Sequence, residues 1–159
     1  STSDQDMEDY GVISLMYHRF DENKYPSTNI RMNEFLEHIK IIEDNNINFI
    51  NPKNFENELK NNKNQRKILL TIDDGFSSFY EHAWPYLKKN KIPFILFVST
   101  EAVGKNGYMS WEQIQNISKH DFVHIGNHSH SHGYLVDKTD EEIRKDLTIA
   151  KQILKKKIK

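Results

Sequence analysis

The chain has 159 residues, enough for one domain, with 36% hydrophobic and 28% charged residues. Its 22 basic and 23 acidic groups give a formal net charge of -1, so the charge balance favours neither nucleic acid nor an anionic membrane as a partner. The lack of cysteine excludes disulfides, thiolate metal sites and cysteine nucleophiles. No apolar stretch reaches the length of a transmembrane segment. We expect residues 1–10 to be a polar N-terminal extension of a domain formed by residues 11–159.

Short apolar runs that predict strands alternate along the chain with segments whose apolar residues repeat at helical spacing. The first run is Val12–Tyr17, and Asn33 is expected to cap the helix that follows it. The first half then predicts the end of that helix at Asn45–Asn46, a short strand at 47–50, a weaker helix at 52–59, a surface loop at 60–66 and a strand at 67–72. In the second half, Ser78 and Glu81 predict the capped start of a helix that is kinked or divided at Pro85, and a strand is predicted at 93–98. Ser110 and Gln113 predict the capped start of the next helix. A strand at 122–125 ended by Gly126 and a last helix from Thr139 follow.

Strands that alternate with helices in this way predict a parallel α/β fold. Polar candidates directly follow four of the predicted strands, namely His18, Asp73–Asp74, Ser99–Thr100 and His128. In parallel barrels the carboxyl ends of the strands carry the active site. We therefore expect these residues to meet at one edge of the sheet.

Two segments far apart in the sequence carry the candidate chemistry. Asp73 and Asp74 end an apolar run, and His128 and His132 place two imidazoles four residues apart. One carboxylate and two histidines are sufficient protein ligands for a catalytic Zn²⁺ or a similar divalent ion. The second carboxylate would be a base beside the metal, so the combination suggests metal-assisted hydrolysis.

Each of these features also has a simpler structural interpretation. Asp-Gly pairs commonly form turns after strands, and Asp73–Asp74 taken alone favours that interpretation. His128 and His132 could be surface histidines, and His130 is a competing ligand that we expect to face away. A structural role is favoured over a site-lining role for His18. The structural role is expected also for His82, His120 and His124.

The two segments that carry the candidate chemistry resemble the motifs of a known protein family. Thr71-Ile72-Asp73-Asp74-Gly75 resembles the first motif of the polysaccharide deacetylases with a NodB homology domain, also called carbohydrate esterase family 4. His128-Ser129-His130-Ser131-His132 resembles their second motif, His-Ser/Thr-x-x-His. Further similarity lies at 93–98 and 109–112, and Leu15-Met16-Tyr17-His18 resembles the subgroup that deacetylates poly-β-1,6-N-acetylglucosamine. The resemblance covers roughly residues 11 to 150 and implies a distorted parallel (β/α) barrel of the NodB type.

The resemblance also implies a role for each matching residue. Asp73 would be the general base, Asp74, His128 and His132 would bind the metal, and Ser129 would brace the histidine loop by hydrogen bonding. The cofactor would be one divalent ion, Zn²⁺ in the first place, with Co²⁺, Ni²⁺ or Fe²⁺ as alternatives. The metal would activate water and polarise the acetamide carbonyl of an N-acetylglucosamine polymer, which then loses acetate.

The family pattern continues beyond the second motif. An Arg-x-Pro-Tyr strand, an Asp-Trp segment and a late Leu-x-His, which supplies the general acid, do not follow His132 in this sequence. The sequence offers about five strand candidates, whereas such barrels have seven or eight strands and take about 200 residues or more. We therefore expect residues 11–159 to be the N-terminal part of a deacetylase domain, an incomplete barrel. Self-association or the missing C-terminal half would cover its open edge.

Three functional interpretations remain open. The leading one is a metal-dependent hydrolase that removes N-acetyl groups from an N-acetylglucosamine-containing polysaccharide. The first alternative is a catalytically incomplete carbohydrate- or metal-binding module, and the second is an interaction protein in which both motifs are turns. The sequence does not choose among poly-N-acetylglucosamine, peptidoglycan, chitin and a xylan ester. Because such substrates occur outside the cytoplasm, we expect a periplasmic, secreted or cell-surface location.

Overall fold

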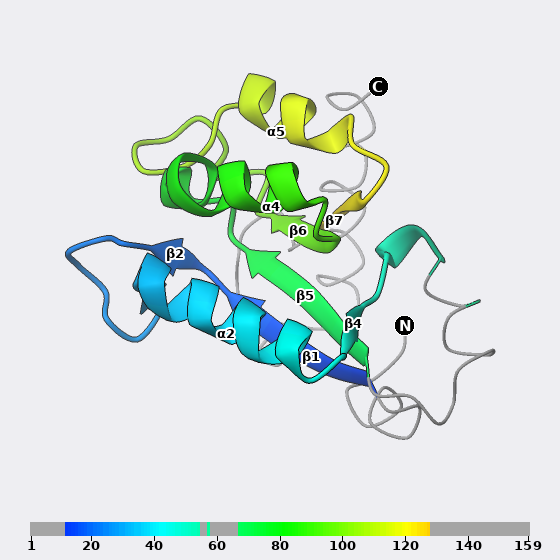
Figure 1. Cartoon of the computed structure of the whole chain (residues 1–159). Coiled ribbons are helices and arrows are strands. Elements are labelled where there is room, and N and C mark those ends of the chain that lie inside the picture. Colours follow the sequence, from blue (N-terminus) through cyan, green and yellow to red (C-terminus); the bar gives the residue numbers. More distant parts are fainter. Residues whose placement is uncertain (1–11, 55–56, 58–66, 128–159) are drawn as a thin grey trace, which may run out of the picture.

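The computed structural model describes residues 12–54, 57 and 67–127 of the chain. Within these residues a parallel sheet forms the centre of the molecule (Figure 1). Its main path runs through β1 (Val12–Tyr17), β5 (Lys67–Asp73), β6 (Phe94–Val98) and β7 (Val123–Asn127), in that spatial order. The short strand β4 (Asn48–Phe49) pairs with the start of β5. The predicted parallel α/β fold is thus confirmed.

The central strand β5 explains why the sheet forms at this place in the chain. All seven of its residues are buried, as expected of a parallel strand that is covered on both faces. It pairs with β1 along Val12–Tyr17, and with β4 and β6 at its beginning and its end. Strand β6 alternates buried and half-buried residues, so it too is covered by protein on one face.

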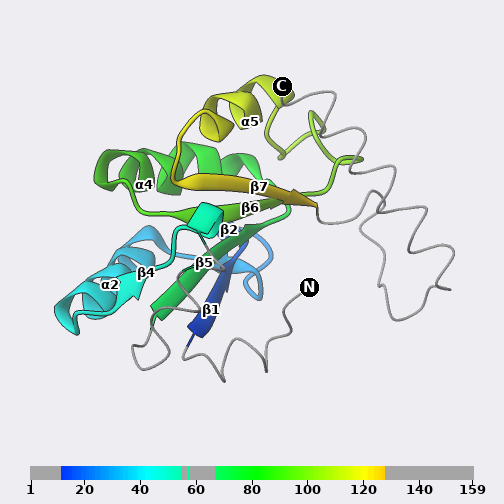
Figure 2. The same cartoon turned by 90° about the vertical axis from the view of Figure 1, so that its right-hand side faces the viewer.

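Three helices cover one face of the sheet: α2 (Met32–Asp44), α4 (Trp84–Asn90) and α5 (Trp111–Ser118). Figure 2 shows all three on the same side of the strands. Their apolar side chains and those of the strands form one core, whose largest fully buried members include Phe35, Ile39, Leu70, Ile72, Phe79, Leu87, Phe94, Leu96 and Ile114. A smaller cluster of Val12, Ile50 and Leu69 with Ile95 lies apart from this core. In the described regions, none of the helices combines the length and apolar character that crossing a bilayer requires.

The start of α2 differs from the prediction. Asn33 lies inside the helix, and the N-cap is Arg31, whose side chain makes no capping hydrogen bond. The carboxylate of Asp21 instead accepts a hydrogen bond from the backbone N–H of Met32, at 3.0 Å. A side chain distant in the sequence thus satisfies the donor that a local cap would have satisfied. The predicted end of the helix is confirmed, with Asn45 as the C-cap.

The predicted capping box of Ser78 and Glu81 is wrong. Ser78 has helical φ and ψ angles and makes no capping hydrogen bond, because its hydroxyl contacts residues near the end of β1. A π-helical turn, η2 (Phe79–Ala83), follows, and α4 then begins with Pro85 in its first turn. Proline is tolerated at this place because the first N–H groups of a helix have no internal partner. The division of the helix at Pro85 is confirmed.

The capping box of Ser110 and Gln113 is present with both of its hydrogen bonds. Strand β7 continues to Asn127, so the prediction that Gly126 ends it is wrong by one residue. The weaker predicted helix at 52–59 appears in part as a 3-10 turn, η1 (Pro52–Asn54). The predicted loop at 60–66 lies entirely outside the described residues, as does the last predicted helix from Thr139.

A second, two-stranded parallel pair was not predicted from the sequence. It joins β2 (Arg19–Phe20) to β3 (Asn29–Ile30) and holds the ends of the loop 21–28 together. Strands of two residues are too short to give a periodic pattern, so the sequence carries no signal for them. This pair lies directly after β1, beside the edge of the main sheet where the candidate site residues lie.

Candidate functional site

The carboxyl ends of the parallel strands bring the predicted polar residues to one edge of the sheet. β1 is followed at once by His18, β5 ends with Asp73, and β6 is followed by the buried Ser99 and Thr100. The register aligns Tyr17 with Ile72, so His18 and Asp73 are the next residues on neighbouring strands. β7 ends at Asn127, directly before His128 in the sequence.

Asp73 and Asp74 sit at a sharp change of backbone direction. Asp73 still pairs with β6 opposite Phe97, whereas Asp74 and Gly75 both have positive φ angles, of 74° and 72°. Aspartate tolerates this left-handed conformation better than most residues, and such positions concentrate at functional sites. One carboxylate oxygen of each aspartate is shielded from solvent. The turn therefore holds two carboxylates side by side at the end of a buried strand.

The loop that precedes α5 holds this turn in place. The backbone N–H of Met109 donates to the carbonyl oxygen of Gly75 at 2.9 Å, and the N–H of Ser77 donates to that of Gly107 at 2.9 Å. Phe76 and Tyr108 form an antiparallel bridge between these bonds, and their rings are 4.9 Å apart. Backbone hydrogen bonds on both sides of the turn thus fix the direction in which the carboxylates point.

His18 lies beside Asp73. Its Nε2 atom is 3.8 Å from Asp73 Oδ2, and the side chains are 26% and 6% exposed. The preceding residue, Tyr17, is buried in the core, and its hydroxyl is hydrogen-bonded to His38 Nδ1 at 2.7 Å. Burial raises the pKa of Tyr17 to about 12, so this phenol stays neutral and anchors the end of β1. The imidazole of His18 therefore lies at the same strand end as Asp73 and is partly open to solvent.

The donor set predicted for a metal is only partly described. Asp74 is placed, whereas His128, His132, Ser129 and the competing His130 lie outside the described residues. Among the described residues, no three carboxylates or imidazoles converge as a metal site requires. The two adjacent carboxylates fit a divalent cation chemically, because a positive charge there would offset their mutual repulsion in a partly buried turn. Oxygen from Asp74 and nitrogen from two histidines suit Zn²⁺ and its neighbours.

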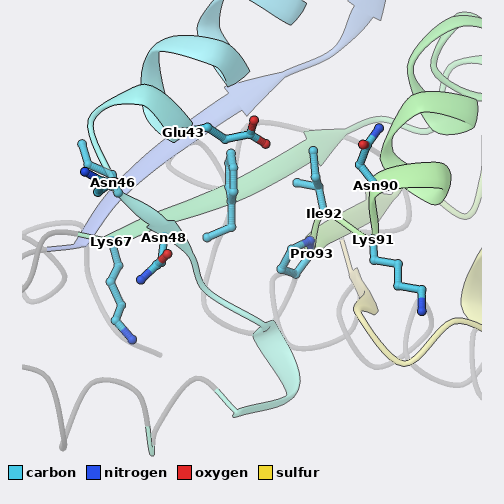
Figure 3. A pocket seen from close by; sticks show the side chains of 10 residues that line it. Glu43, Asn46, Asn48, Lys67, Asn90, Lys91, Ile92 and Pro93 are labelled. Atoms are coloured by element: carbon cyan, nitrogen blue, oxygen red, sulfur yellow. The ribbon is translucent and has the colours of Figure 1, made fainter.

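Two hollows lie at opposite ends of the sheet. A small one of about 290 Å³ borders the candidate site and is lined by Tyr17 and His18 together with Thr28 and Asn29. A larger one of about 700 Å³ lies where the strands begin, against Lys67 and Pro93 (Figure 3). The larger hollow is far from the paired carboxylates, since Lys67 and Asp73 are the two ends of β5. We place the candidate site at the carboxyl edge because the titratable side chains meet there.

A polar cluster that no sequence pattern predicts lies next to these residues. Glu22 accepts hydrogen bonds from Arg19, three residues before it, and from Ser78, 56 residues after it. Their neighbours in sequence are His18 and the turn after Asp74. No periodicity or motif marks such contacts, because they depend on how β2 lies against η2.

Comparison with known proteins bears on the family and the fold of the chain. The sequence model of a family described as polysaccharide deacetylase matches residues 60–159. A poly-β-1,6-N-acetyl-D-glucosamine N-deacetylase of Staphylococcus aureus is 26% identical over 144 residues, covering 82% of this chain and 50% of that protein. The Bacillus subtilis protein YxkH is 26% identical over 141 residues, covering 87% of this chain and 50% of that protein.

A solved structure extends the comparison to three dimensions. The structure of IcaB from Ammonifex degensii superimposes with a TM-score of 0.80 at 28% sequence identity, covering 92% of this chain and 69% of that one. The chain therefore shares the fold of that protein over most of its length. It spans about half the length of the curated relatives it matches.

Proposed function

This chain belongs to the polysaccharide deacetylase family, and we propose on that basis that it carries the catalytic first half of a metal-dependent N-deacetylase. Its fold is the incomplete parallel α/β barrel of the NodB type that the sequence predicts. The observation that carries the proposal is the contact of His18 with Asp73. Asp73 is the last residue of β5, and Asp74 follows it directly. The reaction is the hydrolysis of an acetamide on a sugar, which yields a free amine and acetate.

The metal ligands in this proposal are Asp74, His128 and His132. Support comes from the chemistry of the donor set and from the position of Asp74, next in sequence to the end of β5. When bound, the divalent ion would lower the pKa of water and polarise the acetamide carbonyl. Ser129 would brace the histidines by hydrogen bonding.

Asp73 is the proposed general base. Its side chain is only 6% exposed, and its backbone is held in place by the pairing of β5 with β6. It takes a proton from the attacking water while the new C–O bond forms at the acetamide carbon. A general base must lie within hydrogen-bond reach of the proton that it removes. Asp73 would meet this requirement because it is next in sequence to the proposed metal ligand Asp74, where the activated water would bind.

His18 is the proposed general acid. The imidazole of His18 lies on the same edge as Asp73 and remains partly open to solvent. It donates a proton to the amide nitrogen as the C–N bond breaks, so that the amine leaves uncharged.

The substrate class follows from the relatives. The match to a poly-β-1,6-N-acetyl-D-glucosamine N-deacetylase supports an N-acetylglucosamine polymer as the substrate. A polymer of that kind lies outside the cytoplasm, which supports an extracytoplasmic location for this protein. Because the chain spans about half of that relative, a module that binds the metal or the carbohydrate without turnover is the alternative.

One experiment separates the two. The purified chain is stripped of metal, reloaded with Zn²⁺ or Co²⁺, and incubated with a β-1,6-linked N-acetylglucosamine oligomer while acetate is measured. Release that depends on the metal and is lost in Asp73→Asn would establish the deacetylase. Metal or oligomer binding without acetate release would establish the binding module for this chain.

A further inference from the structure

We propose that Arg19, Glu22 and Ser78 form a positioning clamp that fixes His18 against Asp73. This inference rests on the proposed function, in which these two side chains act on the same substrate. The clamp residues themselves touch no reacting atom. They join the segment that follows His18 to the segment that follows Asp74, and so they set the separation of the two groups.

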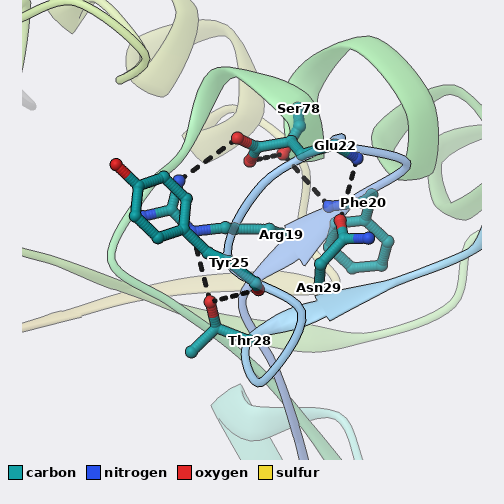
Figure 4. Close-up of polar contacts among 7 residues, drawn as sticks. All are labelled: Arg19, Phe20, Glu22, Tyr25, Thr28, Asn29 and Ser78. Carbon is teal, nitrogen blue, oxygen red and sulfur yellow. Dashed lines mark hydrogen bonds and ion pairs between the residues drawn. The ribbon is translucent and has the colours of Figure 1, made fainter.

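The guanidinium of Arg19 is the centre of the clamp (Figure 4). It lies between two aromatic rings, 4.1 Å from the ring centre of Tyr25 and 3.8 Å from that of Phe76. Its Nε donates to Thr28 Oγ1 at 3.2 Å, and its Nη1 donates to Glu22 Oε1 at 3.2 Å. Both faces and two edges of the planar cation are therefore engaged. A side chain held this fully has little rotational freedom left.

Glu22 and Ser78 complete the connection to the turn. The hydroxyl of Ser78 donates to Glu22 Oε2 at 2.7 Å and accepts from the backbone N–H of Phe20 at 3.1 Å. Glu22 in turn donates its own backbone N–H to Asn29 Oδ1 at 2.8 Å, which ties the loop 21–28 to β3. Ser78 thus holds the backbone two residues after His18 and the carboxylate that holds Arg19.

The clamp gives the site a rigidity that its strands alone do not supply. His18 follows the last paired residue of β1, and Asp74 follows the last residue of β5, so ladder hydrogen bonds end at the site. Just after the two strands end, Arg19 contacts Phe76 and the backbone N–H of Phe20 donates to Ser78. These contacts connect the segment after β1 to the segment after β5. The side chains of Arg19 and Glu22 are 17% and 28% exposed, so solvent weakens their ion pair less than it would a surface pair.

The clamp makes a prediction that a purely structural role does not. In Arg19→Gln the His18–Asp73 geometry loosens, so kcat for acetate release falls about 10- to 100-fold while KM stays within about threefold. Arg19→Lys keeps the charge but lacks the planar fork, so we expect it to be nearly as impaired. Arg31→Gln is the matched control, because Arg31 lies beside the same loop, is 52% exposed and forms an ion pair with Asp21 at 3.9 Å.

Hydrogen exchange gives a readout that does not depend on activity. In Arg19→Gln and Ser78→Ala the amide of Phe20 should exchange about 10-fold faster, whereas the amide of Ile114 in α5 should keep its wild-type rate. Equal acceleration at both amides, full activity in Arg19→Lys, or a rise in KM at constant kcat would overturn the clamp. If the wild-type chain releases no acetate, the proposed function fails for this chain, and the exchange rate of Phe20 alone then decides whether the clamp exists.

Discussion

Phe97 of β6 packs directly on the backbone of Gly126 in β7. The two residues are register partners, and a Cβ atom built on Gly126 would lie 2.7 Å from both Cδ1 and Cε1 of the Phe97 ring. Phe97 is also the partner of Asp73 on the other side of β6. The glycine therefore makes room for the ring of Phe97, whose backbone lies between Asp73 on β5 and Gly126 on β7.

Replacing this glycine tests the packing directly. Gly126→Ala should destabilise the fold by about 1–3 kcal/mol, because the ring must move within a packed sheet. Urea denaturation measures the loss. The double variant Gly126→Ala with Phe97→Leu should recover part of it, since the smaller side chain frees space, and the two effects should not add. A change below about 0.5 kcal/mol in Gly126→Ala would show that the ring relocates freely.

Asp73 and Asp74 should be separable by matched amide substitutions. Asp73→Asn should lower acetate release at least about 100-fold and leave metal content unchanged, because only the proposed base is lost. Asp74→Asn keeps a residue that tolerates the positive φ of 74°, so the fold should persist while metal affinity falls about 10- to 100-fold or more. Metal analysis and circular dichroism on both proteins check this. Loss of metal in Asp73→Asn would reverse the assignment.

His18 should matter for turnover more than for stability. His18→Gln should reduce kcat about 100-fold or more if this imidazole protonates the leaving amine. Its side chain is partly exposed and lies outside the apolar core, so the thermal midpoint should change little. His82→Gln is the control, since His82 is a more exposed histidine that pairs only weakly with Glu81 at 4.0 Å. Equal activity of the two variants would remove His18 from the mechanism.

The capping box of α5 should account for a measurable share of stability independently of function. Ser110 Oγ accepts from the N–H of Gln113 at 3.2 Å, and the Gln113 side chain accepts from the N–H of Ser110 at 3.0 Å. Ser110→Ala should cost about 1 kcal/mol, the usual cost of losing an N-cap. Ser118→Ala, at the other end of the same helix, should cost less, because its hydroxyl bonds only a carbonyl that water can also reach. Thermal melts compare the two.

His124 should make stability depend on pH. Partial burial, and to a lesser degree the charge of Lys53, lower the pKa of His124 from 6.5. The unfolded chain then binds the proton more readily than the folded one, so stability is lost as the pH falls from 6.5 toward the lowered pKa. The urea midpoint should be lower at about pH 5.5 than at about pH 7.5, by a smaller margin in His124→Gln. An unchanged margin in that variant would assign the dependence to other groups.

Local patterns in the sequence determined the strands and one helix start. The apolar runs at 12–17, 67–72 and 93–98 became β1, β5 and β6. Of these strands, β5 has all seven residues buried, as an apolar run covered on both faces of a parallel sheet predicts. Ser110 and Gln113 capped α5 as predicted, because both partners of that hydrogen-bond pair lie within one helical turn.

The same reasoning was wrong where a side chain found a distant partner. Ser78 does not cap its own helix because Glu22 and the N–H of Phe20 engage its hydroxyl. Asn33 does not cap α2 because Asp21 accepts the hydrogen bond from Met32. The N-cap preference of a residue reflects only its neighbours in sequence. A hydrogen bond to a residue distant in sequence can override that preference.

The sequence by itself offered the candidates: Asp73 and Asp74 after a buried strand, His128 and His132 later in the chain, and His18, for which it favoured a structural role. Only the tertiary structure decided that His18 and Asp73 face each other, since this depends on the parallel register that aligns Tyr17 with Ile72. Register is fixed by which side chains the two strands bury together, and neither strand carries that information alone.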